Sequence, residues 1–370
     1  MRPEEVAARL PLIATDDPSP KRRLPLLPVE QLLREQSTLT AVERFSKLHD
    51  APDAPLKEKY YRDLLPLNAP RPGEQYAFQV DLDLCTGCKA CVSACHTLNG
   101  LDTDELWRTV GSLHGGTKDA PAQQTITTSC HHCLEPACLK GCPTLAYDKD
   151  PVTGIVKHLD DQCFGCQYCT LMCPYDAPKF NPARGIVRKC DMCSDRLAHG
   201  EAPACVQACP NGAIAIRVVE RTAVVAAADA QAFLPGTPEP AHTMPTTQYK
   251  TSRELPSNML PADFYRTRPE HAHLPLVIML TLTQLAAGAF AVALAAGRGA
   301  GDLLVQALLA TGMGLMGLGA SVFHLGRPLQ AWRAFLGLRT SWLSREAVAF
   351  GVFAKCAVAY CGSLLLLRAA

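Results

Sequence analysis

Several features that would assign a function directly are missing from this sequence of 370 residues. Lysine and arginine almost balance aspartate and glutamate, so the net charge of +1 gives no argument for a nucleic-acid partner. Met1 to Asp50 contains no apolar stretch long enough for an export signal peptide. We also find neither a glycine-rich nucleotide loop nor a nucleophile–base constellation. We therefore expect no substrate site on this chain.

Charge is spread unevenly along the chain. From His273 onward, seven lysines and arginines stand against two acidic residues, a balance of +5, so residues 1–272 together carry −4. The same carboxyl-terminal part is strongly apolar. A part that is both basic and apolar predicts a membrane partner rather than a nucleic acid.

Cysteine is over-represented, since 16 of the 18 cysteines lie between Cys85 and Cys209. Disulfide frameworks are typical of short secreted domains, whereas this chain is long and shows no export signal, so metal ligation is the better interpretation. The cysteines form four runs: Cys85, Cys88, Cys91 and Cys95; Cys130, Cys133, Cys138 and Cys142; Cys163, Cys166, Cys169 and Cys173; and Cys190, Cys193, Cys205 and Cys209.

The spacing within the runs indicates iron–sulfur clusters. The first and third runs read C-x2-C-x2-C-x3-C, in which three thiolates reach one cubane and the fourth reaches a neighbouring one. In the second, third and fourth runs, a proline follows the last cysteine and turns the chain away. In the first run, His96 takes the place of this proline. Zinc is the alternative, because paired C-x2-C units also bind it, but zinc needs no third close cysteine. Since no run lacks a ligand, we predict four [4Fe–4S] clusters.

The predicted fold class is α+β: two ferredoxin-like dicluster modules followed by an all-α transmembrane segment of about three helices. Residues 1–75 are an extension with one amphipathic helix over 29–50. Residues 76–220 form the cluster domain. Residues 221–272 contain seven prolines and are expected to be a linker or an extended arm. Residues 273–370 form the membrane anchor.

The sequence predicts short strands in the cluster domain and membrane-spanning helices in the anchor. Alternating or β-branched residues predict four strands in the cluster domain, over 76–82, 154–159, 185–189 and 213–219. Residues 274–296 and 303–325 are each 23 residues without charge and can cross a bilayer. A third span over 347–367 is interrupted by Lys355, which must face protein or water, or snorkel.

The four runs, in their order and spacing, resemble the four-cluster electron-transfer subunits of molybdopterin oxidoreductases, and most closely the iron–sulfur subunit of dimethyl sulfoxide reductase. The resemblance covers residues 76–215. It implies that the first run pairs with the fourth and the second with the third. The implied ligand sets are Cys85, Cys88, Cys91 and Cys209; Cys95, Cys190, Cys193 and Cys205; Cys130, Cys133, Cys138 and Cys173; and Cys142, Cys163, Cys166 and Cys169.

The carboxyl-terminal part resembles the start of the membrane anchor of the same enzymes, on FHLGRPLQAWRAF (323–335) and LSREAVAFG (343–351). The anchor family's quinol site uses a histidine and a glutamate that match His324 and Glu346. A histidine near the quinol ring could accept a released proton. Glu346 has a structural alternative as an acidic residue in the first turn of a helix capped by Ser344. The family's anchor has about eight spans, whereas about three are predicted here. Either a further membrane anchor subunit supplies the remainder, or the sequence is a fragment of a longer fusion.

The resemblance implies an electron-transfer subunit, not itself catalytic, that links the membrane quinone pool to a molybdopterin catalytic subunit. Electrons flow from quinol in an anaerobic reductase, or in reverse in a quinone-reducing dehydrogenase. An alternative from another functional class is a membrane-tethered iron–sulfur sensor. A sensor needs few clusters and an output domain, whereas this sequence predicts four clusters and shows no recognisable output domain. The expected location is a bacterial inner membrane, and two crossings place His324 on the side of the clusters. The loop after His324 carries Arg327, Arg333, Arg339 and Arg345, and positively charged loops favour the cytoplasmic side of the membrane. If the folded cluster domain is instead exported together with a signal-bearing catalytic partner, the clusters lie on the opposite side.

Several residues inside or near the cluster runs have two alternative roles. Hydrogen bonds from His131 and His132 could tune a cluster, but exposed loop positions are the default expectation. Lys179, Arg188 and Lys189 lie near the fourth run, where they could dock a partner or tune a cluster.

Overall fold

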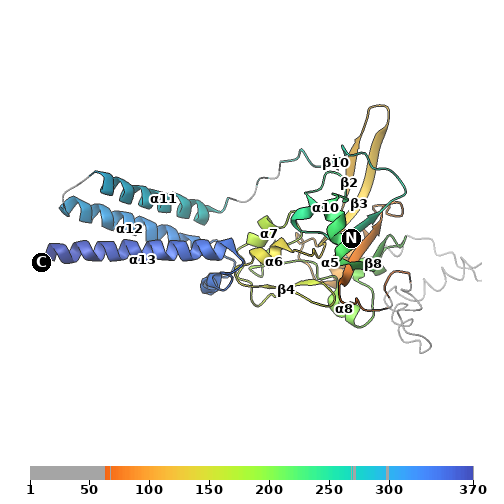
Figure 1. The fold of residues 1–370 in the computed structure, drawn as a ribbon, viewed down its shortest axis with the longest axis horizontal. Coiled ribbons are helices and arrows are strands. Elements are labelled where there is room, and N and C mark those ends of the chain that lie inside the picture. Colours follow the sequence, from red (N-terminus) through yellow and green to blue (C-terminus); the bar gives the residue numbers. More distant parts are fainter. Residues whose placement is uncertain (1–62, 67, 268, 270–271, 297–299, 370) are drawn as a thin grey trace, which may run out of the picture. The chain divides into compact units, whose positions relative to one another are not determined.

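The computed structural model describes residues 63–369 except 67, 268, 270–271 and 297–299. The amphipathic helix predicted over 29–50 lies outside these residues. The described chain has two three-stranded sheets, two small hairpins and several short helices in its cysteine-rich part, followed by three long helices (Figure 1). This arrangement confirms the predicted α+β fold with a carboxyl-terminal helical segment.

The first sheet has the order β8-β1-β9. Strand β1 (Glu74–Asp81) pairs antiparallel with β8 (Ile214–Glu220), with Phe78 opposite Ile216 and Val80 opposite Ile214. All four of these side chains are almost fully buried. Apolar and β-branched residues at these positions explain why the segments are strands. The first and last cysteine runs thus start and end beside one pair of strands.

The second sheet was not expected from the sequence. It has the order β10-β2-β3 and contains a long hairpin of β2 (Arg108–Gly116) and β3 (Pro121–Ser129), with β10 (Leu260–Pro261) at its edge. The two long strands are rich in Thr and Gly, so they lack the apolar alternation that marks a strand. Their apolar contacts are with residues far away in the sequence, including Val80, Leu82 and Met259.

Two small hairpins flank the second and third cysteine runs: β4 (Tyr147–Lys149) with β5 (Val156–His158), and β6 (Lys179–Asn181) with β7 (Ile186–Arg188). Five short helices lie among the cysteine runs, and together they carry five of the sixteen cysteines. They are α5 (Ala90–Leu98), α6 (Ala137–Gly141), α7 (Tyr168–Met172), α8 (Ser194–Ala198) and α9 (Ala204–Gln207). Helix α5 packs on α9 and α6 on α7, so the first run meets the fourth and the second meets the third.

Residues 221–272, for which we expected a linker or an extended arm, are attached to the cluster domain along much of their length. They begin with α10 (Arg221–Asp229) and the 3-10 turn η1 (Pro240–His242). Strand β9 (Gln248–Lys250) then pairs in parallel with β1, and β10 pairs with β2. Met259 lies fully buried between them. Prolines break this segment into short pieces, two of which, β9 and β10, pair with the edges of the two sheets.

Three helices are long and apolar enough to cross a membrane: α11 (Leu274–Ala295), α12 (Ala300–Val322) and α13 (Trp342–Ala369). The first two closely match the predicted spans. Helix α13 starts five residues before its predicted span at 347, so Glu346 lies inside it. A loop with the 3-10 turn η2 (Pro328–Phe335) joins α12 to α13.

Candidate metal centres and the membrane-facing loop

The sixteen cysteines of the four runs are free thiols that gather in four groups of four. We name these groups site I (Cys85, Cys88, Cys91, Cys209), site II (Cys95, Cys190, Cys193, Cys205), site III (Cys130, Cys133, Cys138, Cys173) and site IV (Cys142, Cys163, Cys166, Cys169). They coincide with the ligand sets implied by the resemblance. That each cysteine binds iron stays a prediction.

The cysteines of three sites surround cavities. These cavities lie at sites I, III and IV, and each is lined by all four cysteines of its site. Within the described residues, no group of three or more His, Cys, Asp or Glu side chains could hold a single metal ion. Four soft sulfur donors arranged around a cavity instead suit a cluster of several iron atoms.

The four thiols of site II lie close enough to change one another's pKa. Burial raises the pKa of Cys95 to about 12, and Cys205 and Cys193 add to the rise. Burial also raises the pKa of Cys190, with Cys95 and Cys205 contributing. Because a buried thiolate is costly without compensating charge, these groups favour a cationic partner such as iron.

Single turns of helix hold neighbouring sites together. Cys91 of site I and Cys95 of site II both lie on α5. Similarly, Cys138 of site III lies on α6, and Cys142 of site IV is the residue that ends this helix. Residues four apart on a helix are neighbours on one face, about 6 Å apart. The C-x3-C spacing therefore places site I beside site II, and site III beside site IV.

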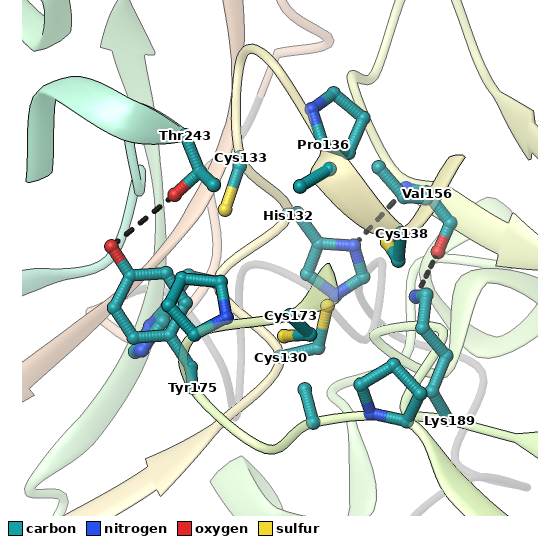
Figure 2. A pocket seen from close by; sticks show the side chains of 15 residues that line it. Cys130, His132, Cys133, Pro136, Cys138, Val156, Cys173, Tyr175, Lys189 and Thr243 are labelled. Carbon is teal, nitrogen blue, oxygen red and sulfur yellow. Dashed lines mark hydrogen bonds between the residues drawn. The ribbon is translucent and has the colours of Figure 1, made fainter. Parts of the chain in front are cut away.

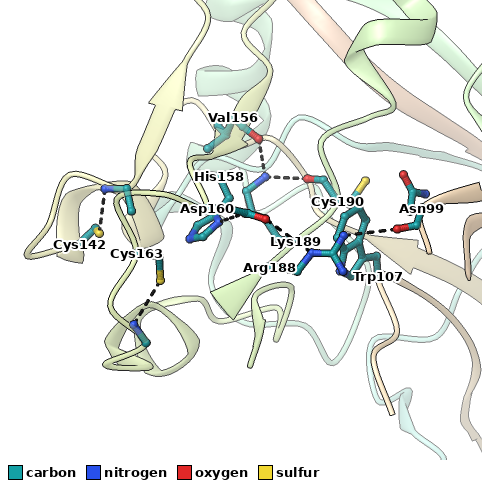
Figure 3. Close-up of polar contacts among 12 residues, drawn as sticks. Asn99, Trp107, Cys142, Val156, His158, Asp160, Cys163, Arg188, Lys189 and Cys190 are labelled. Atoms are coloured by element: carbon teal, nitrogen blue, oxygen red, sulfur yellow. Dashed lines mark hydrogen bonds and ion pairs between the residues drawn. The ribbon is translucent and has the colours of Figure 1, made fainter. Parts of the chain in front are cut away.

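Lys189 connects the two pairs of sites. Its side chain is 2% exposed, and its ammonium group donates hydrogen bonds to the carbonyl oxygens of Val156 and, at 2.7 Å, Cys190 (Figure 3). It also lines the cavity of site III. Burial opposes a positive charge here, but negative charge on Cys130, Cys138 and Cys190 outweighs it and raises the pKa of Lys189. Sites II and III thus share a buried cation.

Arg108 is a second buried cation, and sequence reasoning missed it because the β2–β3 hairpin was not predicted. Its side chain is 2% exposed and donates to Ser129 Oγ at 2.9 Å and Thr127 Oγ1 at 3.3 Å. Its guanidinium carbon lies 4.7 Å from the centre of the Phe78 ring. Burial opposes its charge, but cysteines of sites I and II outweigh this effect and raise its pKa.

Arg188 has a structural role within the domain. It forms an ion pair of 3.0 Å with Glu105, which is 3% exposed. It also packs on Trp107 (Figure 3). Glu105 also accepts hydrogen bonds from Trp107 Nε1 at 2.7 Å and from Asn181 Nδ2 at 2.9 Å. Because its donors are used inside the domain, Arg188 does not present its charge to a partner.

The expectation that His131 and His132 are exposed loop residues was wrong, because they are 4% and 0% exposed. The arm covers His131: Thr247 Oγ1 lies 2.8 Å from His131 Nδ1, and Thr246 Oγ1 donates to the His131 carbonyl oxygen. His132 instead contacts Gln75 and Val156. Burial lowers the pKa of His131 to about 3 and holds that of His132 well below its usual range. Both rings line the cavity of site III.

Site IV has its own set of aromatic and polar neighbours that the sequence did not reveal. Tyr147 and His158 line its cavity, and their ring centres are 4.9 Å apart. His158 Nδ1 lies 2.8 Å from a carboxylate oxygen of Asp160. This hydrogen bond lowers the pKa of Asp160.

The loop between α12 and α13 lies against the cysteine loop of site IV. The amide of Arg327 donates to Phe164 O at 3.0 Å, and its guanidinium donates to Asp160 O at 3.0 Å and Cys163 O at 3.3 Å. Arg333 donates to Asp161 O at 2.5 Å. Two of the four arginines considered as topology signals therefore also bind the cluster domain.

Glycines and one serine also contribute to the contact between the loop after α12 and the chain around site IV. A Cβ added at Gly326 would lie 2.2 Å from Gly185 O, and one added at Gly165 would lie 2.3 Å from the same oxygen. The three backbones can approach so closely only because none carries a side chain. Further along the loop, Gly337 N donates to Pro143 O and Ser341 Oγ donates to Gly141 O, both at 2.7 Å. The loop thus touches the chain on both sides of site IV.

The two residues predicted for quinol binding lie near the helix ends. His324 follows α12, is half-buried, and donates a hydrogen bond from Nδ1 to Ser321 O. Glu346 is exposed on α13. Among the described residues, no hydrogen bond or ion pair links the two. Ser344 is not the helix cap, since α13 begins at Trp342 and Ser341 precedes it.

Comparisons with known proteins give the class of this chain. Residues 122–219 match the 4Fe-4S dicluster domain, residues 78–95 the 4Fe-4S binding domain, and residues 270–367 the DMSO reductase anchor subunit (DmsC). The chain is thus an iron–sulfur protein of the 4Fe-4S type joined to a membrane anchor domain, and it is membrane-associated.

Curated relatives narrow the class to a family. The B subunit of anaerobic dimethyl sulfoxide reductase from Haemophilus influenzae is 41% identical over 146 residues, which are 37% of this chain and 71% of the relative. Its Escherichia coli counterpart is 40% identical over 144 residues, which are 37% of this chain and 70% of the relative. The formate dehydrogenase-O iron-sulfur subunit of E. coli is 35% identical over 159 residues, 38% of this chain and 52% of the relative. The chain belongs to the family of iron–sulfur subunits represented by the B subunit of anaerobic dimethyl sulfoxide reductase.

Proposed function

We propose that this chain is the electron-transfer subunit of a membrane-bound molybdopterin oxidoreductase, with four [4Fe–4S] clusters held at sites I to IV. The observation that supports this most is the serial arrangement of the sites. Helix α5 joins sites I and II, Lys189 joins sites II and III, and α6 joins sites III and IV. Site IV in turn contacts the loop that leads into the membrane helices.

The residues of the chain hold and shield the clusters. Bound [4Fe–4S] clusters supply one-electron redox chemistry. The cysteine thiolates provide the ligands, while the buried Arg108 and Lys189 compensate the negative charge that these thiolates bring into the interior. Most of the sixteen cysteines are buried, which limits access of water and oxygen. A molybdopterin subunit is proposed as the partner toward site I.

At the membrane end we propose that quinol or quinone exchanges electrons beside His324 and Glu346. His324 lies two residues before Gly326, which touches the chain at site IV. Its Nδ1 is occupied by Ser321, so Nε2 is the ring atom left to exchange a proton with a quinol. The exposed Glu346 carboxylate offers a second proton acceptor on α13.

The relatives support two candidate directions of electron flow. The dimethyl sulfoxide reductase relatives favour flow from quinol toward a reductase, which is the first candidate function. The formate dehydrogenase relative favours the reverse flow, from a dehydrogenase to quinone, as the second candidate. A bacterial inner membrane is the proposed location in both cases.

Further membrane helices are proposed to cover α13. Lys355 is exposed in the middle of this helix, where about 15 Å of hydrocarbon would separate it from either interface. A charge at that depth needs a polar partner, so we expect a helix of a further anchor subunit to carry one. Lys355→Leu should weaken co-purification of that subunit in mild detergent. Unchanged co-purification, or no such subunit with the native chain, would refute this part.

The central test is anaerobic EPR on membranes that contain the full complex, before and after addition of a reduced quinol analogue. We expect quinol to reduce several interacting [4Fe–4S] signals in the native protein and in Leu329→Ala, a control at an exposed residue of the same loop. His324→Ala should abolish this reduction, while dithionite should still reduce all four clusters. If quinol reduces the His324→Ala protein normally, the quinol site lies elsewhere. If dithionite reveals fewer than four clusters, the assignment of the sites is wrong.

A further inference from the structure

His132 occupies a strained and fully buried position beside site III. Its backbone φ is +44°, in the left-handed region that only a few per cent of residues other than glycine adopt, Asn, Asp and His more often than the rest. Its side chain is 0% exposed. The buried Gln75 of β1 donates to the His132 carbonyl oxygen at 3.0 Å. The backbone is therefore held in this conformation by a neighbouring strand, which fixes the direction of the ring.

A hydrogen bond from the backbone determines which ring nitrogen of His132 carries the proton. The amide of Val156 donates to Nδ1 at 3.1 Å (Figure 2). An amide N–H can only donate, so Nδ1 must be the unprotonated nitrogen of a neutral ring. The ring proton is therefore on Nε2.

Nε2 carries a donor that the described residues leave without a partner. It is buried and has no hydrogen-bond acceptor among them. The ring lines the cavity of site III together with Cys130, Cys133, Cys138 and Cys173. Figure 2 shows the ring between Val156 and the cavity side occupied by the Cys130 and Cys173 sulfurs. Because a buried N–H without an acceptor is unfavourable, a sulfur in this cavity is the group that would satisfy it.

We propose that the His132 Nε2–H donates a hydrogen bond to a sulfur of the cluster at site III and thereby raises the reduction potential of that cluster. The inference rests on the proposed presence of a cluster at this site. A reduced cluster carries one more negative charge than an oxidised one, so a donor stabilises the reduced form more. His132 acts as a neutral donor, which separates its effect from that of the cation Lys189 on the same cavity.

Two substitutions separate the donor from the structural role of the ring. In His132→Asn, the amide oxygen can replace Nδ1 as acceptor for Val156 N–H, and asparagine tolerates a positive φ, but no donor reaches the Nε2 position. In His132→Gln, the longer side chain can place an N–H near the Nε2 position while losing the acceptor at Nδ1. The first variant keeps the fold contact, and the second keeps the donor.

The experiment is an EPR-monitored redox titration of the purified full complex carrying each variant. For His132→Asn we expect one of the midpoint potentials to fall by an amount that corresponds to about a tenfold change in the redox equilibrium, about 59 mV for one electron. His132→Gln should shift the same potential distinctly less. No shift in the asparagine variant, or equal shifts in both variants, would overturn the proposal.

A measurement on the native complex keeps the proposal testable if a variant loses its cluster. Pulsed EPR with ¹⁵N-labelled histidine should detect a histidine nitrogen coupled to one reduced cluster, and lack of any such coupling would also refute the donor. Iron analysis and the number of titrating clusters test the function separately. A missing cluster at site III in the native complex would refute the proposed function, whereas four clusters without nitrogen coupling would refute only the role of His132.

Discussion

The cluster domain and the membrane helices stabilise their interiors by different means. In the cluster domain the helices have four to nine residues, and the interior contains Arg108 and Lys189 beside ten buried cysteines of the four runs. In the anchor, three helices of 22, 23 and 28 residues place mainly apolar side chains on their surfaces. The first region leaves its centre to the cluster sites, and the second leaves its surface to lipid.

The two regions therefore obtain their stability from different sources. Buried cations and thiols are unfavourable unless they are paired, so the cluster domain depends on what its sites hold. Long helices satisfy their own backbone hydrogen bonds and need only an apolar surrounding. The loss of iron should therefore affect the two regions very unequally.

Removal of iron is the strongest test of this contrast. We expect iron chelation under reducing conditions to expose residues 76–250 to protease while the helical circular-dichroism signal of α11 to α13 persists. The free energy of metal binding is comparable to or larger than the roughly 5–15 kcal/mol by which domains are usually stable. Protease resistance of the iron-free domain would contradict this expectation. As a control, Cys361→Ala, at a buried cysteine of α13 outside the four sites, should leave the iron content unchanged.

Breaking the ion pair of Arg188 should have the next largest effect, again confined to the cluster domain. Arg188→Met leaves Glu105 buried and unpaired, which should destabilise the domain by about 3–5 kcal/mol. Thermal unfolding followed by loss of the visible cluster absorbance measures this change. Adding Glu105→Gln, which removes the uncompensated charge, should recover part of the loss. If the double variant is less stable than Arg188→Met alone, the charge was not the cause.

A substitution at the junction between the two regions should have a smaller effect. A Cβ at Gly326 would lie 2.2 Å from Gly185 O, so Gly326→Ala should push the loop from the site IV contact at a cost of about 1–3 kcal/mol. Slower reduction of the clusters by quinol, with unchanged iron content, is the expected readout. Gly319→Ala, at a glycine of α12 with open space around it, is the matched control. Equal rates in the two variants would show that the contact does not matter.

Local patterns in the sequence were sufficient for much of this architecture. The four strands predicted around the cysteine runs are present as β1, β5, β7 and β8, and the three long helices lie at the predicted spans. Strand alternation, cysteine spacing and long apolar stretches depend on neighbours along the chain, so they can be read without coordinates. The family resemblance supplied the grouping of the cysteines, which the geometry reproduces.

The sequence alone therefore determined the chemistry of the ligands, the class of the cluster domain and the presence of membrane-spanning helices. Only the tertiary structure decided that His131 and His132 are buried, that Arg108 lies beside two sites, and that Arg327 binds the loop of site IV. Each of these facts depends on segments far apart in the sequence: the arm that covers His131, the strands whose residues Gln75 and Val156 contact His132, the unpredicted hairpin, and the loop after α12. Spacing along the chain records local geometry, whereas burial and charge at a site depend on every segment that folds against it.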